Sequence, residues 1–274
     1  MVGIVGSIVG SIKSAAIPTT FGFDTAVKVY SQLIGNLAID AMSAKKYYYF
    51  IRLMGRSSSL VTLECALQTH PTVTLIGEEV EAKQQKLMDI VRYVADAVQM
   101  RAQRGRNYGI VLIPEGLLAM MPDMNVLISE LNQLLRTQSG EGVGSPGKQG
   151  SFGSLAVLTP DKVASLLTPW SSALFKFLPL SIQEQLLAER DASSGSVNFT
   201  QITTEKLLAE LVEVELKQRK AAGTYKSSFN AIPFFFGYQV GPRVRWCPPC
   251  VCTAAACLSI ALLASGMRRL NVCY

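Results

Sequence analysis

Two polar side chains stand where short apolar runs end. Arg56 and its neighbour Gly55 follow the apolar run at residues 47–53, and Glu115 follows the run at residues 110–113. Arginine offers a planar fork of donors that suits phosphate or carboxylate, and a carboxylate accepts hydrogen bonds from hydroxyls. Single polar residues rarely carry function alone. By themselves these positions favour a turn glycine, a solvated charge and a strand-end carboxylate.

Residue types that bind metals are unevenly spread. His70, the only histidine, precedes a proline at the end of an expected helix, and we interpret it as structural. Cys247 and Cys250 have the spacing of half a zinc site, but no second pair stands at the usual distance. The distribution is not that of a disulfide framework, because all cysteines except Cys65 lie near the C-terminus, at Cys247, Cys250, Cys252, Cys257 and Cys273.

The composition predicts a globular core and a modest preference for anionic partners. The chain has 274 residues, of which 49% are hydrophobic, and a formal net charge of +6. Lysine and arginine are scattered and form no basic stripe, which argues against nucleic-acid binding. A phosphorylated substrate would suit the same charge balance.

The apolar stretches near both ends do not favour a targeting or membrane segment. Residues 1–12 are apolar, but no basic region precedes them, so we expect a cytoplasmic protein and interpret this stretch as an altered buried strand. Residues 251–267 are mostly apolar and borderline in length for a membrane span. We favour a displaced core segment there over a short tail anchor.

Strands and helices are expected to alternate through the first half of the chain. Asp24 is placed to cap a helix that continues to about Ala41. Alternation of this kind implies βαβ units and a parallel sheet. The expected strands are 47–53, 73–76 and 110–113, and the expected helices after the first are 57–68, 87–98 and 127–135.

The second half is expected to be helical. Residues 137–154 are rich in Gly, Ser and Gln and predict a flexible linker. Residues 161–223 follow a helical pattern, with Glu213 and Lys217 paired at i,i+4 and Gly223 as the C-terminal stop. The expected organisation is an altered strand at 1–16, an α/β half at 17–136, the linker at 137–154, an α-helical insertion at 155–230 and a divergent segment at 231–274.

Several long blocks together resemble one family, the long, plant-type pyrophosphate-dependent phosphofructokinases, and in particular their catalytic beta subunit. The resemblance extends from about Val2 to Tyr238 and implies an incomplete phosphofructokinase-type α/β domain with a helical insertion. The matching blocks are TFGFDTA at 20–26, KYYYFIRLMGR at 46–56, LECALQTHP at 63–71, IPEG at 113–116, EKLL at 205–208, GTYK at 223–226 and FFGY at 235–238.

The resemblance implies reversible transfer of a phosphoryl group from pyrophosphate to the 1-hydroxyl of fructose 6-phosphate, with magnesium. In the family, Met-Gly-Arg and Pro-Glu-Gly face the sugar phosphate. Carried over, Met54 and Gly55 bring the backbone close to the sugar, Arg56 offers its fork of donors, and Glu115 accepts from sugar hydroxyls. Lys46 and Tyr47 match positions that reach into a neighbouring subunit's site. The other implied substrate-binding positions are Ser7, Ile8, Tyr238 and Arg243.

The chain departs from the family where the chemistry is done. The family's Pro-Lys-Thr-Ile-Asp-Gly-Asp motif matches VGSIVGS at residues 5–11. Val9 stands at the position of the proton-accepting aspartate, Gly6 at that of the lysine and Ser11 at that of the second aspartate. Loss of a general base alone costs about a hundred- to ten-thousand-fold in rate. We therefore expect an inactive isolated chain.

Further departures affect the donor, the metal and the sugar phosphate. The family's Gly-Gly-Asp-Asp loop for pyrophosphate and magnesium is expected before Met1, so we expect no magnesium ligand in this chain. The family's Gly-Tyr-Glu-Gly-Arg becomes GYQVG at 237–241, and Arg243 comes two residues late.

Three alternatives remain open to a chain that is a phosphotransferase by family and inactive in isolation. These are a regulatory subunit that binds fructose 6-phosphate, a scaffold that pairs with an active related phosphofructokinase chain, and a tail-anchored protein. Homo- or hetero-oligomers are expected from the family.

Overall fold

The computed structural model describes residues 6–7, 9, 20–138, 163, 166–187 and 202–237. Its centre is a parallel sheet of four strands in the order β4-β5-β3-β6. The expected α/β class with a parallel sheet is thus confirmed. The strands are β3 (Tyr48–Leu53), β4 (Val73–Thr74), β5 (Gly109–Pro114) and β6 (Ala231–Phe235).

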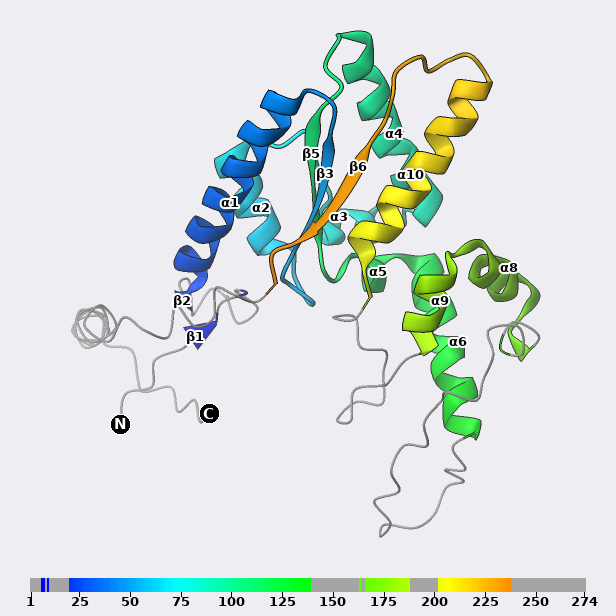
Figure 1. Cartoon of the computed structure of the whole chain (residues 1–274). Helices are drawn as coiled ribbons and strands as arrows, with labels where there is room; N and C mark the ends of the chain where they lie inside the picture. The colour runs from blue at the N-terminus through cyan, green and yellow to red at the C-terminus, as the bar shows by residue number, and fades with distance from the viewer. Residues whose placement is uncertain are drawn as a thin grey trace, which may run out of the picture.

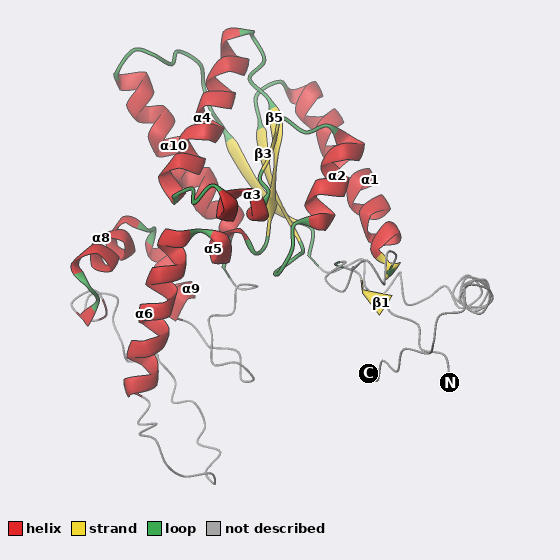
Figure 2. Cartoon of the chain, turned by 180° about the vertical axis from the view of Figure 1, so that it is seen from behind, coloured by secondary structure: helices red, strands yellow, loops and turns green. Residues whose placement is uncertain are grey.

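Helices cover both faces of this sheet (Figures 1 and 2). On one face lie α1 (Phe23–Ala44) and α2 (Leu60–Thr69), and on the other α4 (Leu87–Gln103) and α10 (Thr204–Ala221). Alternate residues of β3 enter different cores: Phe50 packs in the cluster with α4 and α10, whereas Ile51 packs with α1 and α2. All six residues of β3 and of β5 are buried, as expected for strands covered on both faces.

Smaller elements lie around the ends of the sheet. A second parallel pair, β1 (Gly6–Ser7) with β2 (Phe21–Gly22), lies next to the start of α1. The core shared with α4 and α10 continues into the helical region through Leu131, Phe175 and Ile182. The remaining helices are α3 (Gly77–Ala82), α5 (Leu117–Met120), α6 (Pro122–Gln138), α8 (Pro169–Phe177) and α9 (Leu180–Leu187).

Two elements connect the second half of the chain to the sheet. Helix α10, from the expected insertion at 155–230, packs against α4, β3 and β6. Strand β6, from the expected divergent segment at 231–274, pairs in parallel with β3 along five residues, from Ala231 beside Tyr48 to Phe235 beside Arg52. The boundary expected at residue 231 therefore does not separate β6 from the sheet, because Ala231–Phe235 pairs with β3.

Several expected helix starts are wrong by a few residues, and α6 begins at Pro122 rather than at 127. Helix α1 begins at Phe23, after Gly22 with a φ of 95°, and no side chain caps it. Asp24 lies inside the first turn instead, where its charge still favours the helix dipole. Helix α2 begins at Leu60 rather than at 57, because the Ser59 hydroxyl accepts from the Gly77 amide and does not cap the helix. The expected Glu213–Lys217 pair is confirmed at 2.7 Å.

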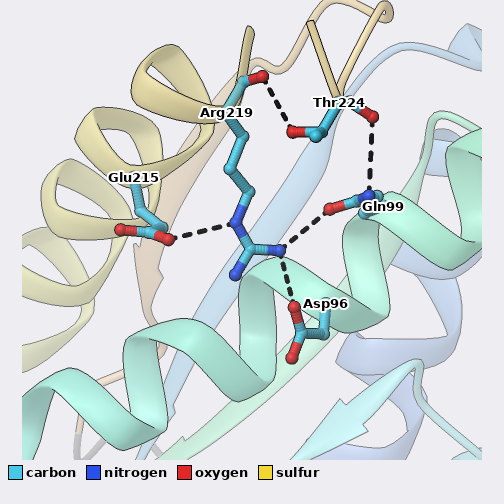
Figure 3. A network of polar contacts seen from close by, with 5 residues as sticks. All are labelled: Asp96, Gln99, Glu215, Arg219 and Thr224. Carbon is cyan, nitrogen blue, oxygen red and sulfur yellow. Dashed lines mark hydrogen bonds and ion pairs between the residues drawn. The ribbon is translucent and has the colours of Figure 1, made fainter. Parts of the chain in front are cut away.

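A polar network joins α10 to α4 (Figure 3). The Arg219 guanidinium donates to Asp96 at 2.6 Å and to Gln99 at 2.9 Å on α4, and to Glu215 at 3.0 Å on its own helix. The Thr224 hydroxyl donates to the Arg219 carbonyl at 2.9 Å, just beyond the end of α10. The network therefore links two neighbouring helices of the same layer.

Several expectations concern residues outside this description. They include most of the expected linker at 137–154, the cysteines from Cys247 onward and the apolar stretch at 251–267. Of the helices that the structure describes, none combines the length and apolar character needed to cross a membrane.

Candidate functional site

The two predicted loops begin side by side at the carboxyl edge of the sheet. Strands β3 and β5 are parallel neighbours, with Leu53 opposite Pro114. Residues 54–56 and 115–116 therefore leave the sheet at the same place. In open α/β sheets, ligands bind at this edge of the strands.

Three hydrogen bonds join these segments, two between backbone groups and one from a backbone amide to a side chain. The Glu115 amide donates to the Leu53 carbonyl at 3.0 Å, and the Gly116 amide donates to the Gly55 carbonyl at 3.0 Å. The Gly55 amide in turn donates to the Glu115 carboxylate at 3.4 Å. The Met-Gly-Arg and Pro-Glu-Gly motifs, which the family resemblance implies at one ligand, are therefore hydrogen-bonded neighbours in the structure.

Both glycines are needed for this close approach. Gly55 has a φ of +136°, and a Cβ there would lie 2.6 Å from the Ser58 carbonyl oxygen. A Cβ on Gly116 would lie 2.1 Å from the Arg56 carbonyl oxygen. Residues with a side chain rarely adopt the φ of Gly55. A real Cβ could be placed 2.6 Å or 2.1 Å from a carbonyl oxygen only if the backbone moved.

The residues predicted to bind the sugar phosphate differ in their exposure to solvent. Arg56 is exposed, as an anion-binding side chain should be, whereas Met54 is buried in the core with α1 and α2. Glu115 is only 1% exposed, and its carboxylate faces the Gly55 amide. In the structure, Glu115 therefore supports the 54–56 loop.

The matched catalytic segment lies next to this loop. A Cβ on Gly55 would lie 3.7 Å from Cγ1 of Val9, so the residue matched to the family's proton-accepting aspartate adjoins the 54–56 loop. Gly6 and Ser7 form β1, beside the start of α1. Ile8, Tyr238 and Arg243 lie outside the described residues.

Lys46 and Tyr47 are not brought to this site. They precede β3, whereas Met54 follows it, and a strand of six residues is about 20 Å long. The Lys46 ammonium lies 5.1 Å from the centre of the Tyr47 ring at the opposite edge of the sheet. Within one chain, these two residues and Arg56 cannot hold the same small molecule.

The strand that leads to the 54–56 loop carries a buried cation, which was missed as a site residue in the sequence analysis. Arg52 is 3% exposed, and its Nε lies 3.0 Å from Oε2 of Glu205 as an ion pair without hydrogen-bond alignment. The signal was available, because a charged residue inside a strand buried on both faces must find a partner.

Burial and neighbouring charge act together on Glu205. Burial raises the pKa of the Glu205 carboxyl, the Arg52 guanidinium opposes this rise, and the Glu115 carboxylate adds to it. The pKa of Glu205 therefore depends on the charge of Arg52 and, to a smaller extent, on that of Glu115, the residue predicted to accept from sugar hydroxyls.

A separate open cavity of about 470 Å³ lies between α1 and α2. Neither loop contributes to it, so we place the candidate site by the hydrogen bonds between the loops. Its lining consists of Lys28, Ser31, Gln32, Gly35, Gln68 and Thr69.

Known proteins similar to this chain form one group. A phosphofructokinase family model matches residues 1–145. The beta subunit of pyrophosphate–fructose 6-phosphate 1-phosphotransferase from Solanum tuberosum is 48% identical over 239 residues, which make up 87% of this chain and 39% of that protein. The alpha subunit from the same organism is 46% identical over 240 residues, 87% of this chain and 36% of that protein. The enzyme of the same name from Treponema pallidum is 45% identical over 241 residues, 87% of this chain and 40% of that protein.

The family match includes both loops and Val9, and the chain spans about two fifths of the length of these relatives. The parallel sheet and the paired loops thus agree with the sequence comparison. The chain belongs to the pyrophosphate-dependent phosphofructokinase family.

Proposed function

We propose that this chain binds fructose 6-phosphate at the carboxyl edge of β3 and β5 and does not itself transfer the phosphoryl group. The observation that carries the proposal is the hydrogen-bonded pair of loops, which places exposed Arg56 beside buried Glu115. The relatives are named for the reaction of pyrophosphate with fructose 6-phosphate. That substrate and a cytoplasmic location come to this chain as part of the proposal.

Arg56 supplies the charge that the sugar phosphate requires. Its guanidinium can present two parallel donors to phosphate oxygens, and such charge-assisted bonds are stronger than neutral ones. The carboxylate of Glu115 accepts from a sugar hydroxyl in place of its 3.4 Å contact with the Gly55 amide. Because Glu115 is buried, this step requires a small displacement of the 54–56 loop.

The missing chemistry concerns the proton and the developing charge. Phosphoryl transfer needs an acceptor for the hydroxyl proton and cations that stabilise the transferring group. Val9 has no group that can accept a proton, and Gly6 has no ammonium. In the part of the chain that the structure describes, no three His, Cys, Asp or Glu side chains are grouped to hold a metal ion.

Turnover and thermal stability test the two halves of this proposal. The purified chain should not phosphorylate fructose 6-phosphate with pyrophosphate or ATP, whereas its melting temperature should rise with fructose 6-phosphate. Turnover of about 1 to 100 per second would contradict the catalytic half. Residual activity that survives Ser7→Ala and Arg56→Ala would identify a contaminant.

Glu115→Gln examines the acceptor role. The variant keeps the shape of the side chain and removes its charge, so the gain in melting temperature should shrink less than in Arg56→Ala. An unchanged gain would assign Glu115 to support of the loop alone.

A regulatory subunit is a second candidate. The chain is 48% identical to a beta subunit and 46% identical to an alpha subunit of the same plant enzyme, and Lys46 and Tyr47 lie too far from Arg56 to share its ligand. We propose that these residues serve the site of a second, related chain. Co-purification with an active phosphofructokinase chain, lost in Lys46→Ala, would support this function. Retention of the partner by Lys46→Ala would contradict the role of Lys46.

A further inference from the structure

Three charged side chains are buried in the described part of the chain, and two of the three form an ion pair. They are Arg52 at 3% exposure, Glu115 at 1% and Glu205 at 6%. An isolated charge is costly to bury, so such groups need partners. The Arg52–Glu205 pair meets this need near the end of β3, the strand that leads to the 54–56 loop.

Arg52 connects β3 to three other parts of the fold. Its guanidinium donates to the Ile202 carbonyl and pairs with Glu205 at the start of α10. It also lies 3.9 Å from the centre of the Phe235 ring, at the carboxyl end of β6. One side chain on β3 thereby holds the segment before α10, the first turn of α10 and the end of β6.

The Arg52–Glu205 pair is linked to the 54–56 loop through the backbone. Arg52 stands two residues before Met54, where the loop begins. The Leu53 carbonyl, one residue after Arg52, accepts from the Glu115 amide, and the Glu115 carboxylate accepts from the Gly55 amide and adds to the rise in the pKa of Glu205. A movement of Arg52 would therefore shift the end of β3, where both the 54–56 loop and Glu115 are attached.

We propose that Arg52 is a positioning residue for the sugar-phosphate site, which acts by fixing Glu205 and the end of β3 so that Glu115 and the 54–56 loop keep their relative placement. This inference rests on the proposed function, because it names a residue that shapes the same site. Arg52 itself contacts no substrate in this arrangement.

The double variant Arg52→Met/Glu205→Leu separates positioning from general stability. Replacing a buried ion pair by apolar residues of similar size is often neutral or stabilising, so the fold should persist. Exchange of the Gly55 and Gly116 amide protons, followed by nuclear magnetic resonance on the full chain, should accelerate about tenfold. Exchange at Val94, in the core of α4, should stay unchanged and serves as the control for global stability.

Binding of fructose 6-phosphate is measured on the same samples. The double variant should bind about tenfold more weakly than the parent chain, a loss that a merely structural pair would not cause once stability is restored. Unchanged exchange at Gly55 and Gly116 in a stably folded double variant would overturn the inference. If the parent chain fails to bind the sugar, the proposed function fails, and the exchange rates still decide the role of Arg52.

Arg52→Lys provides a second route if the double variant does not fold. The lysine keeps the charge opposite Glu205 but cannot stack as a plane on Phe235 while donating to Ile202. The same local acceleration, with Val94 unchanged, supports the inference. Equal exchange in Arg52→Lys and the parent overturns it.

Discussion

Gly55 and Gly116 bring two loop backbones closer together than residues with side chains allow. The atom that a Cβ on Gly116 would meet, at 2.1 Å, is a backbone oxygen and not the end of a flexible side chain. A methyl group at residue 116 can therefore be accommodated only if the backbone of one of the two loops moves. This is why two residues without side chains control the placement of Arg56 and Glu115.

Gly116→Ala should lower the free energy of unfolding by about 1 to 3 kcal/mol, because the new methyl group forces the loops apart. Gly35→Ala is the matched control, since nothing lies within 4 Å of a Cβ at that position in the middle of α1. It should raise the free energy of unfolding by about 0.5 to 1 kcal/mol. Urea unfolding measures both. A loss as large in Gly35→Ala would show that the close approach is not the cause.

Tyr225 gives the folded chain a specific sensitivity to alkali. Burial raises the pKa of its hydroxyl to about 12, with a further contribution from Tyr48. A tyrosine in the unfolded chain loses its proton near 10, so the unfolded state is deprotonated first as pH rises. The free energy of unfolding should therefore fall between about pH 10 and pH 12.

The Tyr225→Phe variant should lose less stability than the parent between pH 9 and pH 11, as measured by urea unfolding. Tyr93→Phe, at a position that is 57% exposed, should lose as much as the parent. Equal losses in the parent and Tyr225→Phe would remove Tyr225 from the explanation.

The sequence predicts the placement of some single residues but not their partners in the fold. The placement of Arg56 and Glu115 at the ends of strands could be predicted, because the apolar runs before them end there, whereas the pairing of these two strands is known only from the structure. The partner of Arg52 could not, because Glu205 is distant along the chain and meets it only when α10 packs on the sheet. The burial of Glu115 likewise depends on packing between distant segments.

At the scale of elements, α10 covers the face of the sheet opposite α1 and α2, and β6 is the last strand on one side of the sheet. Helix α10 contacts α4, β3 and β6, and the Arg219 network links it to α4. Glu205, in its first turn, is the partner of Arg52. The position of α10 is therefore connected directly to the candidate site.

Arg219→Met should lower the free energy of unfolding by about 1 to 2 kcal/mol, because it removes the polar link and keeps much of the apolar stem. Most of the loss should come from the better-buried contact with Glu215, since the side chain of Asp96 is 62% exposed and screened by water. Urea unfolding by circular dichroism gives the measurement.

Lys217→Met is the control for Arg219→Met. The Lys217–Glu213 pair is exposed by 71% and 45%, so its loss should cost less than about 0.5 kcal/mol. Equal effects of the two substitutions would mean that Arg219 acts as an ordinary surface charge.

Elements differ in how well the sequence predicts them. The strands at Tyr48–Leu53 and Gly109–Pro114 were predictable from continuous apolar runs, which are typical of strands covered on both faces. Strand β6 was not predicted. It contains Pro233, and a proline is tolerated in the outermost strand of a sheet. That β6 is an outermost strand is known only from the strand order in the structure.

The whole molecule combines the paired loops of the proposed binding site with a valine at the position matched to the catalytic base. Its sheet, paired loops and family match agree with a phosphofructokinase half, while Val9 stands beside the loop where the base would act. The net charge of +6 suits an anionic ligand. Binding without turnover is therefore the property that the whole chain should display.

Calorimetry of the full chain with fructose 6-phosphate at low salt tests this property most directly. The parent should bind, and glucose 6-phosphate should compete poorly. Arg56→Lys should bind about tenfold more weakly although it keeps the charge, because one ammonium cannot replace the planar fork. Arg104→Lys, an exposed substitution at the end of α4 and at the other edge of the sheet, should bind like the parent. No heat at millimolar fructose 6-phosphate, on a chain that circular dichroism shows to be folded, would contradict a working sugar-phosphate site.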